Sequence, residues 1–562
     1  MNHKAEKVEI AQRISYVSNA SHAKSGDYEG IKTPDVLEAQ DGALRAGGAP
    51  NLLSKDHIGL ILQYAAVGLI YGVIPATIYP FLQSYLNASG TQVVTASTLV
   101  VLPWSFKIFY GIVSDCFPIR GYRRRPYMLL GWSICFVMLF IMAVTPVGDP
   151  YFLNPDDADI APKDYPLYPG IENRFNLDAP DKAGKYVLLM MFAAFGYLMA
   201  DVTADAVVVE LAQREPLAVR GTTQSAIYGT RTLFQAVGTM LTGFAFNGEK
   251  YGGSFDFSLS FPVLMLILAL FLLPILPITW FYIKEEKSER VVFSEYMLDL
   301  WRLIQTRAVY QIVFFNFFSN VFANFSYTAA SPIQRFIVKA EPINVTISDV
   351  LGSLVFFAGI FITGKWGLNW NWRWITVVTG IIVIGADAIV TFVTVWDVFR
   401  SQWIWLGVPI AINVPSGISF IIGTYVVVEL ADEGNEGAIY GLLTTVSNLS
   451  SPFAATLTKI VDREWDFSNA RIQDDSHDVR MDITKSILLM YGMTIISWGF
   501  LIFLPKQKAE TQELKRNGGS SKILGALTVF YVAFAFEWSV MTNLMGIWES
   551  TACLIIAGGD GC

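Results

Sequence analysis

The side chains best suited to chemistry are charged residues within long apolar runs. Asp201 and Asp205 stand four apart in the run at 185–208, and Arg231 lies in the next run, at 223–246. Residues four apart share one helix face. A carboxylate can accept paired N–H donors or a proton, and a guanidinium binds a carboxylate through two hydrogen bonds. The set is therefore a ligand site or a structural ion pair, since buried charges need partners.

Further polar side chains lie in neighbouring runs. In the run at 309–333, Asn316, Asn320 and Asn324 follow at a spacing of four, which places them on one side of a helix. They either line a pathway or join helices by hydrogen bonds, as polar residues in membranes commonly do. Lys107 lies in an earlier run, where its long side chain either reaches the membrane surface or contacts a substrate anion.

The composition indicates a membrane protein. The 562 residues are 53% hydrophobic and 16% charged, whereas soluble domains carry about 25% charged residues. Lipid is therefore the expected surrounding, and a net charge of −8 argues against nucleic acid as a partner. The four histidines and four cysteines form no catalytic or metal-binding motif, so we expect no enzyme activity and no cofactor.

Apolar runs of the length of a membrane span recur along the chain. A crossing helix needs about 20 mostly apolar residues. Twelve such runs and a thirteenth are found at 58–82, 92–113, 127–145, 185–208, 223–246, 260–282, 309–333, 346–367, 373–395, 402–429, 438–460, 484–504 and 523–543. We therefore predict an all-α polytopic membrane protein.

An internal repeat divides the runs into two sets of six. The sequence "VVVELA" occurs at 207–212 and 426–431, and "AIYG" follows at 226–229 and 438–441. Two matched identities in the same order indicate two homologous six-helix halves. Parallel halves of this kind are the architecture of major facilitator transporters, whose substrate site lies between the halves near the middle of the membrane.

The repeat and the polar segments divide the chain into five parts. We expect a disordered cytoplasmic tail, a first half, a cytoplasmic connector, a second half, and a basic linker with an extra helix and a short outer tail, at 1–57, 58–282, 283–308, 309–504 and 505–562. Cytoplasmic loops collect Lys and Arg. The arginines after the second run therefore place the N-terminus in the cytoplasm, and we favour the plasma membrane over an organelle.

The C-terminal cysteines depend on the thirteenth run. If residues 523–543 cross the membrane, Cys553 and Cys562 reach the outer face, where a disulfide is stable. The glycine-rich sequence between them allows the sulfurs to meet. The alternative is two free thiols on a segment that lies along the membrane, which Glu537 within the run keeps open.

The segment "GIVSDCFPIRGYRRRPYML" resembles the loop signature of the major facilitator superfamily. The matching residues are Gly111, Asp115, Gly121, Arg123, Arg124 and Arg125. The longer segment "LPWSFKIFYGIVSDCFPIRGYRRRPY" is similar to the folate–biopterin transporter family, with Ile108 where the family often has proline. The resemblance implies alternating-access transport of folate or a pterin, with the loop signature as a gate.

The resemblance also suggests roles for the buried charges. The aspartates would accept the paired N–H donors of a pterin ring, and Arg231 would bind the glutamate tail of a folate. Coupling to a proton or an anion is expected. The alternatives are another organic metabolite such as S-adenosylmethionine, or a receptor or scaffold that does not transport. The charges favour a carrier, since a scaffold has no need of charge in lipid. The oligomeric state stays open.

Overall fold

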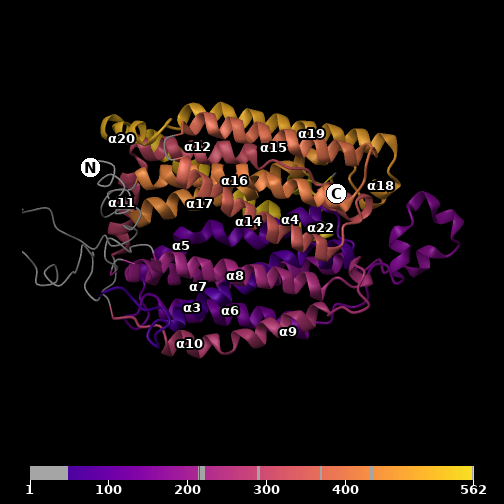
Figure 1. The fold of residues 1–562 in the computed structure, drawn as a ribbon, viewed down its shortest axis with the longest axis horizontal. Helices are drawn as coiled ribbons and strands as arrows, with labels where there is room; N and C mark the ends of the chain where they lie inside the picture. The colour runs from indigo at the N-terminus through magenta and orange to yellow at the C-terminus, as the bar shows by residue number, and fades with distance from the viewer. Residues whose placement is uncertain are drawn as a thin grey trace, which may run out of the picture.

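Long helices lying side by side make up the structure, a computed structural model (Figure 1). It describes residues 48–212, 214, 222–287, 292–367, 370–430, 436–559 and 561–562. Most of the tail predicted at 1–57 lies outside these residues. The bundle has two ends, which we call the loop end, where residues 146–182 project, and the connector end, where residues 292–306 lie.

The first half forms the lower part of Figure 1. Its helices are α3 (Ile58–Ala76), α4 (Gly90–Val101), α5 (Lys107–Cys116), α6 (Arg125–Val144), α7 (Ala183–Ala212), α8 (Thr222–Ala245), α9 (Phe261–Leu272) and α10 (Ile275–Phe281). A π-helical segment, Ile78–Tyr85, continues α3, and a 3₁₀ turn, Leu102–Phe106, joins α4 to α5. Thus α4 and α5 form one crossing.

The second half follows the connector helix α11 (Phe293–Ile304). Its helices are α12 (Arg307–Ala323), α13 (Ala330–Pro332), α14 (Pro342–Trp366), α15 (Trp372–Val395), α16 (Gln402–Leu430), α17 (Glu436–Asp462), α18 (Asn469–Asp474) and α19 (His477–Ser497). After it come α20 (Lys508–Asn517), α21 (Lys522–Met545) and α22 (Glu549–Ala552). Within the described residues, nine helices are long and apolar enough to cross a membrane.

The repeat occupies matched places in the two halves. The first "VVVELA" ends α7, and the second reaches the end of α16 at Leu430; each "AIYG" lies near the start of the next long helix, α8 or α17. The halves meet where α14 packs on α8 and where α17 packs on α4 and α5. Helices α8 and α17 are matched by the repeat, and each packs against a helix of the opposite half. The two contacts are therefore equivalent when the halves are interchanged, which supports a two-fold arrangement. The predicted boundaries of the two halves, with the first half ending at residue 282 and the second beginning at residue 309, remain a proposal.

The helix predicted at 309–333 is broken, which corrects the prediction. Helix α12 ends at Ala323, and Asn324 lies beyond it, so the three asparagines do not share one continuous helix. The break is satisfied from α17. The backbone N–H of Thr328 donates to Asp462 at 2.6 Å, and that of Ser326 donates to Thr458 at 3.1 Å. Irregular backbone persists at membrane depth only when such partners replace the helical hydrogen bonds.

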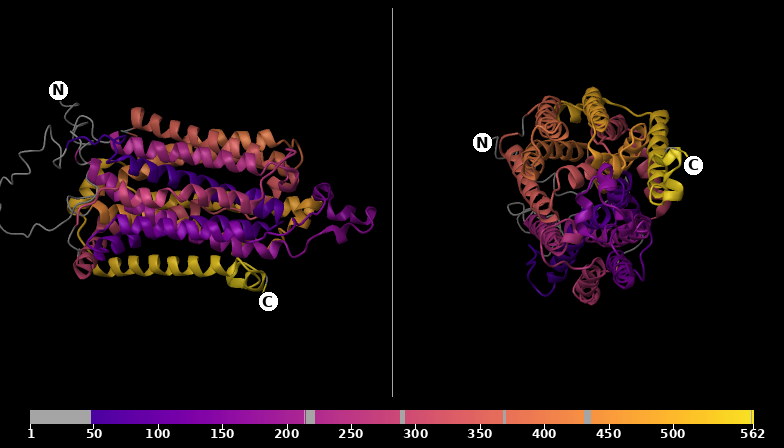
Figure 2. Two further views of the ribbon diagram at one scale, coloured as in Figure 1. Left: turned by 90° about the horizontal axis from the view of Figure 1, so that it is seen from below. Right: turned by 90° about the vertical axis from the view of Figure 1, so that its right-hand side faces the viewer.

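The predicted thirteenth helix is present as α21, along the outside of the bundle (Figure 2). It contacts both halves. Phe536 lies 4.6 Å from Phe106 between ring centroids, and Asn543 accepts a hydrogen bond from the buried Lys459 at 3.0 Å. Beyond α21, the predicted Cys553–Cys562 disulfide closes the C-terminal turn at the loop end.

Candidate functional site

The charged residues of the first half form one cluster. Asp201 is fully buried, and its carboxylate lies 3.5 Å from Arg231 and 4.0 Å from Lys107. Lys107 is also 3.7 Å from Asp205. Two carboxylates and two cations cancel, so the cluster can exist within a membrane at a tolerable cost. Of the two predictions for Lys107, the structure favours contact with the site over extension to the surface.

Hydrogen bonds fix Asp205 more closely than Asp201. The hydroxyls of Tyr64 and Tyr228 both donate to Asp205, at 2.5 and 3.2 Å. The distances from Asp201 to its cations exceed the 2.7–3.2 Å or so of a normal hydrogen bond. Asp201 is therefore a counter-ion that leaves N–H groups of both cations available, because Lys has three donors and Arg has five.

A local distortion of the α4–α5 crossing orients Lys107. Pro103 cannot donate a backbone hydrogen bond, and the chain forms a 3₁₀ turn over Leu102–Phe106 before α5 begins at Lys107. This turn also brings Trp104 beneath the ammonium group, 4.6 Å from its ring centroid. The crossing is therefore interrupted just before Lys107, although Ile108 stands where the resemblance leads one to expect proline.

Aromatic rings surround the cations. The guanidinium of Arg231 lies 5.0 Å from the ring of Tyr228 and 6.0 Å from that of Trp104. Tyr71 lies 5.3 Å from Trp104 between centroids. Such rings stabilise a partly desolvated cation and offer flat faces to a ligand. The cluster thus combines cationic hydrogen-bond donors with surfaces on which a planar heterocycle can stack.

The cluster faces the interior of the bundle. On α8, the exposed apolar residues Leu233, Val237 and Phe244 mark the lipid-facing side. At 100° per residue, Arg231 lies about 140° around the helix from them. Its side chain is 24% exposed, and that of Asp205 is 25% exposed. A ligand between the halves can therefore reach both groups.

The predicted asparagines of the second half are not part of this cluster. Among the described residues, no hydrogen bond or ion pair joins Asn316, Asn320 or Asn324 to it. The amide of Asn324 instead donates to the carbonyl of Asn320 at 2.8 Å, next to the end of α12. The binding roles predicted for all three remain predictions.

The loop signature forms a compact network of an ion pair and hydrogen bonds at the connector end. Asp115 pairs with Arg124 at 2.8 Å. The backbone N–H groups of Arg123, Arg124 and Arg125 all donate to Glu285, at 2.6, 2.8 and 2.9 Å, so this carboxylate caps the start of α6.

The glycines of the signature differ in what they require. Gly121 has φ +84°, and a side chain there would contact Lys287. Only glycine adopts this turn without strain. By contrast, a Cβ on Gly111 would meet no atom within 4 Å. The turn thus explains Gly121, and nothing in the structure explains Gly111.

The loop end is closed by contacts between the halves. Lys339 pairs with Asp159 at 2.9 Å, and the amide of Gln473 donates to the carbonyls of Ala158 and Ile160, each at 2.8 Å. A surface hollow of about 560 Å³ lies beside these residues, away from the charged cluster.

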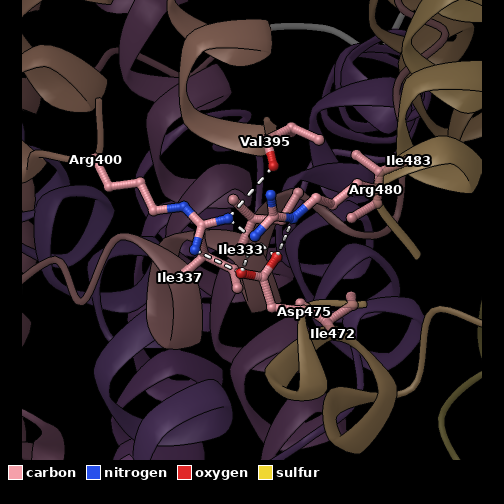
Figure 3. Close-up of a pocket in the computed structure, with 8 residues that line it drawn as sticks. All are labelled: Ile333, Ile337, Val395, Arg400, Ile472, Asp475, Arg480 and Ile483. Carbon is pink, nitrogen blue, oxygen red and sulfur yellow. Dashed lines mark hydrogen bonds and ion pairs between the residues drawn. The ribbon is translucent and has the colours of Figure 1, made fainter. Parts of the chain in front are cut away.

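An ion cluster stabilises the second half at this end. Asp475 lies between Arg400 and Arg480, at 2.6 and 2.7 Å (Figure 3). Isoleucines line one side of the three side chains, which are each about a fifth exposed.

Some candidate residues were missing from the sequence prediction. In the sequence, Tyr228 stands out only as part of the repeat, and Trp104 only as part of the segment that carries the resemblance. Asp349 on α14 was overlooked, although an acid within the predicted run at 346–367 is itself a signal.

Similar proteins of known name are transporters. The "Folate-biopterin transporter" of Synechocystis sp. is 22% identical over 509 residues, which cover 86% of this chain and 89% of the relative. The "Probable folate-biopterin transporter 4" of Arabidopsis thaliana is 24% identical over 184 residues, 32% of this chain and 30% of the relative. The "Folate transporter 1" of Plasmodium falciparum is 40% identical over 45 residues, 8% of this chain and 9% of the relative.

Solved structures confirm the predicted major facilitator fold. A D-xylose-proton symporter superposes with a TM-score of 0.53 at 12% identity, covering 80% of this chain and 98% of its own. An inward-open xylose transporter of E. coli gives 0.51 at 11% identity, covering 82% and 99%. The BT1 family matches residues 68–150 and 177–520. The chain therefore belongs to the BT1 family and is a multi-pass membrane transporter, not an enzyme.

Proposed function

We propose that the chain carries folate or a related pterin across the membrane by alternating access. The observation that carries this proposal is the pair of cations, Lys107 and Arg231, with spare N–H donors beside aromatic rings. A folate offers a planar heterocycle to the rings and carboxylates to the cations. The names of the similar proteins point to the same class of cargo.

We propose separate roles within the cluster. Arg231 is the residue for a cargo carboxylate, because the guanidinium can form two parallel hydrogen bonds. Asp201 balances the charge of the cations while the site is empty. Asp205 accepts hydrogen bonds from Tyr64 and Tyr228 in the empty site. When the cargo displaces these tyrosines, Asp205 accepts hydrogen bonds from N–H groups of the cargo.

The proposal includes the orientation and the membrane. The arginines of the loop signature lie at the connector end, and the disulfide lies at the loop end. Cytoplasmic loops are rich in Arg, and disulfides persist on oxidising faces. These features support a cytoplasmic connector end, an outward loop end and the plasma membrane.

Uptake into cells that lack their own carriers tests the cargo. Labelled folate and biopterin are expected to accumulate above empty-vector cells, with Asp205→Asn as a surface-expressed inactive control. Accumulation of S-adenosylmethionine alone would replace the cargo and leave the carrier role. No uptake of any of the three by a correctly inserted protein would contradict the proposal.

A further inference from the structure

Asp349 is a carboxylate within the second half to which no positive charge among the described side chains is paired. It lies on α14, and its side chain is exposed. The exposed apolar residues Ile347, Leu351 and Leu354 mark the lipid-facing side of this helix. At 100° per residue, Asp349 is about 170° around the helix from them. The carboxylate therefore faces away from lipid.

The contacts of α14 show what Asp349 faces instead. Thr346 touches Gly243 of α8, and Gly352 and Gly359 touch α16. By helical angle, Asp349 lies between these two contact directions. It therefore borders the interior between the halves, one turn below the seam of Thr346 and Gly243, on the connector side.

Other acids inside the described helices have partners. Asp201 and Asp205 have cations, Asp387 accepts from Tyr491 at 2.6 Å, and Asp462 accepts from Thr328 and Ser486. Glu537 is exposed, but it lies on the outward side of α21 with the exposed Phe530 and Phe534. Among the described residues, Asp387 and Asp462 have neutral donors and no counter-charge, whereas Asp349 has neither an ion pair nor a side-chain hydrogen bond.

No described side chain of the neighbouring helices forms an ion pair with it. Arg231 is the charged residue of α8, and it lies about 18 Å along that helix from the seam at Gly243. Glu429 in α16 and Lys365 in α14 both stand near the connector end of their helices. The tyrosines of the two neighbours, Tyr228 and Tyr425, also stand toward that end.

A proton is the cation that such a site can hold. Calcium requires a shell of several oxygen ligands, and the described residues contain no group of three His, Cys, Asp or Glu side chains that could hold a metal ion. A proton needs one carboxylate oxygen. Desolvation disfavours the charged carboxylate, so closure of the halves over Asp349 is easier once it is neutral.

We propose that Asp349 binds the coupling proton, and that its protonation lets α8 and α14 close over it at the loop end. The carboxylate takes a proton from water on the loop side when the seam is open. It releases the proton to water on the connector side after the halves have rearranged. The proposal rests on the proposed transport function but assigns coupling to a residue outside the cargo cluster.

Two transport assays on the purified full-length protein in liposomes test the assignment. Exchange of labelled for unlabelled folate needs no gradient, whereas net accumulation is driven by a pH gradient, alkaline inside. We expect Asp349→Asn to keep exchange within about twofold of the original protein and to lose at least about tenfold of the gradient-driven accumulation. Asp387→Asn, the matched control, should keep both. Accumulation that survives in Asp349→Asn, or equal loss of exchange, would overturn the proposal.

A labelling assay separates this inference from the cargo. Ser353 lies one turn below Asp349 and is also exposed. Ser353 is exposed in this structure, in which the loop end is closed. In a protein with Cys116 and Cys135 replaced, a Ser353→Cys variant should therefore react with a maleimide at least about fivefold faster at about pH 5, where protonation favours the closed loop end, than at about pH 8, after correction for maleimide chemistry on an exposed reference cysteine. Asp349→Asn should abolish this difference. A protein that moves no folate but shows this result would keep the proton site and lose the cargo assignment, and an unchanged difference in Asp349→Asn would overturn the proton site.

Discussion

The helix pairs α7–α8 and α16–α17 are built alike and charged differently. Aligning the two "VVVELA" segments places Phe420 and Thr424 where α7 has its two aspartates, and aligning "AIYG" places Leu443 where α8 has Arg231. Leu443 is buried in the second core, whereas Arg231 faces the interior. Apolar packing is thus common to both helix pairs, whereas the buried charges at these positions occur in the first half.

The loops at the connector end differ in the same way. In the first half, Asp115 and Arg124 form an ion pair. In the second, Arg373 donates to the carbonyls of Ile502 and Leu504, at 3.1 and 2.6 Å. The side chains of Arg124 and Asp115 are only 11% and 26% exposed, so removing one partner leaves the other charge poorly solvated. The loop of the first half is therefore held by charge, and that of the second by hydrogen bonds to backbone carbonyls.

Neutralising Asp205 should have the largest effect. Asp205→Asn leaves two cations with one carboxylate and weakens the hydrogen bonds from two tyrosines, so we expect uptake to fall by at least about 100-fold. Leu443→Ala in the second half should lower stability by about 2–5 kcal/mol and leave cargo preference unchanged. Uptake of each cargo, normalised to surface expression, measures the transport loss and the cargo preference. Thermal melting of the purified protein measures the stability. A similar loss of cargo preference in Leu443→Ala would remove the distinction between the halves.

Breaking the ion pair of the loop should have a moderate effect. Asp115→Asn removes the partner of Arg124 without touching the cargo cluster, so uptake should fall about tenfold while folate affinity changes less than about twofold. Arg373→Gln, the control in the second half, should mainly lower the melting temperature. Binding and uptake that fall together in Asp115→Asn would argue against a gate.

Removing the disulfide should affect stability alone. Cys553 and Cys562 close a short turn beyond α21, and loss of such a cross-link costs about 2 kcal/mol through the entropy of the unfolded chain. Cys553→Ser should therefore melt a few degrees lower in a fluorescence assay and transport normally. Loss of transport would mean that this turn takes part in the cycle, which would extend function beyond the two halves.

The smallest effect is expected in the loop at 475–480. Burial would raise the pKa of Asp475, but hydrogen bonds from Arg480 and Arg400 outweigh it, and the pKa is lowered. The lowered pKa stabilises the fold above the unfolded value of about 3.9, and this contribution is lost as pH falls through the folded value. Asp475→Asn should therefore be less stable than the original protein near neutral pH and equal to it in strong acid, while the exposed Asp478→Asn matches it throughout. A stability difference between Asp475→Asn and the original protein that persists in strong acid would mean that the substitution acts through packing and not through the charge of Asp475.

Much of the fold follows from the sequence, because apolar length and the repeated hexapeptide report burial directly. The break after Asn324 does not, since it depends on Asp462 and Thr458 of a distant helix. The direction of Lys107 depends likewise on the 3₁₀ turn at Pro103. The sequence identifies the members of the charged cluster but not their contacts. It does not identify Asp349, because the significance of this residue depends on the side of α14 that it occupies.

The central claim is that the cations of the first half bind the carboxylates of the cargo. Calorimetric titration of purified Arg231→Ala with folate, and with biopterin, which lacks the glutamate tail, tests it most directly. The account predicts that folate affinity falls at least about tenfold, while biopterin affinity stays within about twofold. Equal loss for both ligands would show that Arg231 is only a structural partner of Asp201, and would contradict the account.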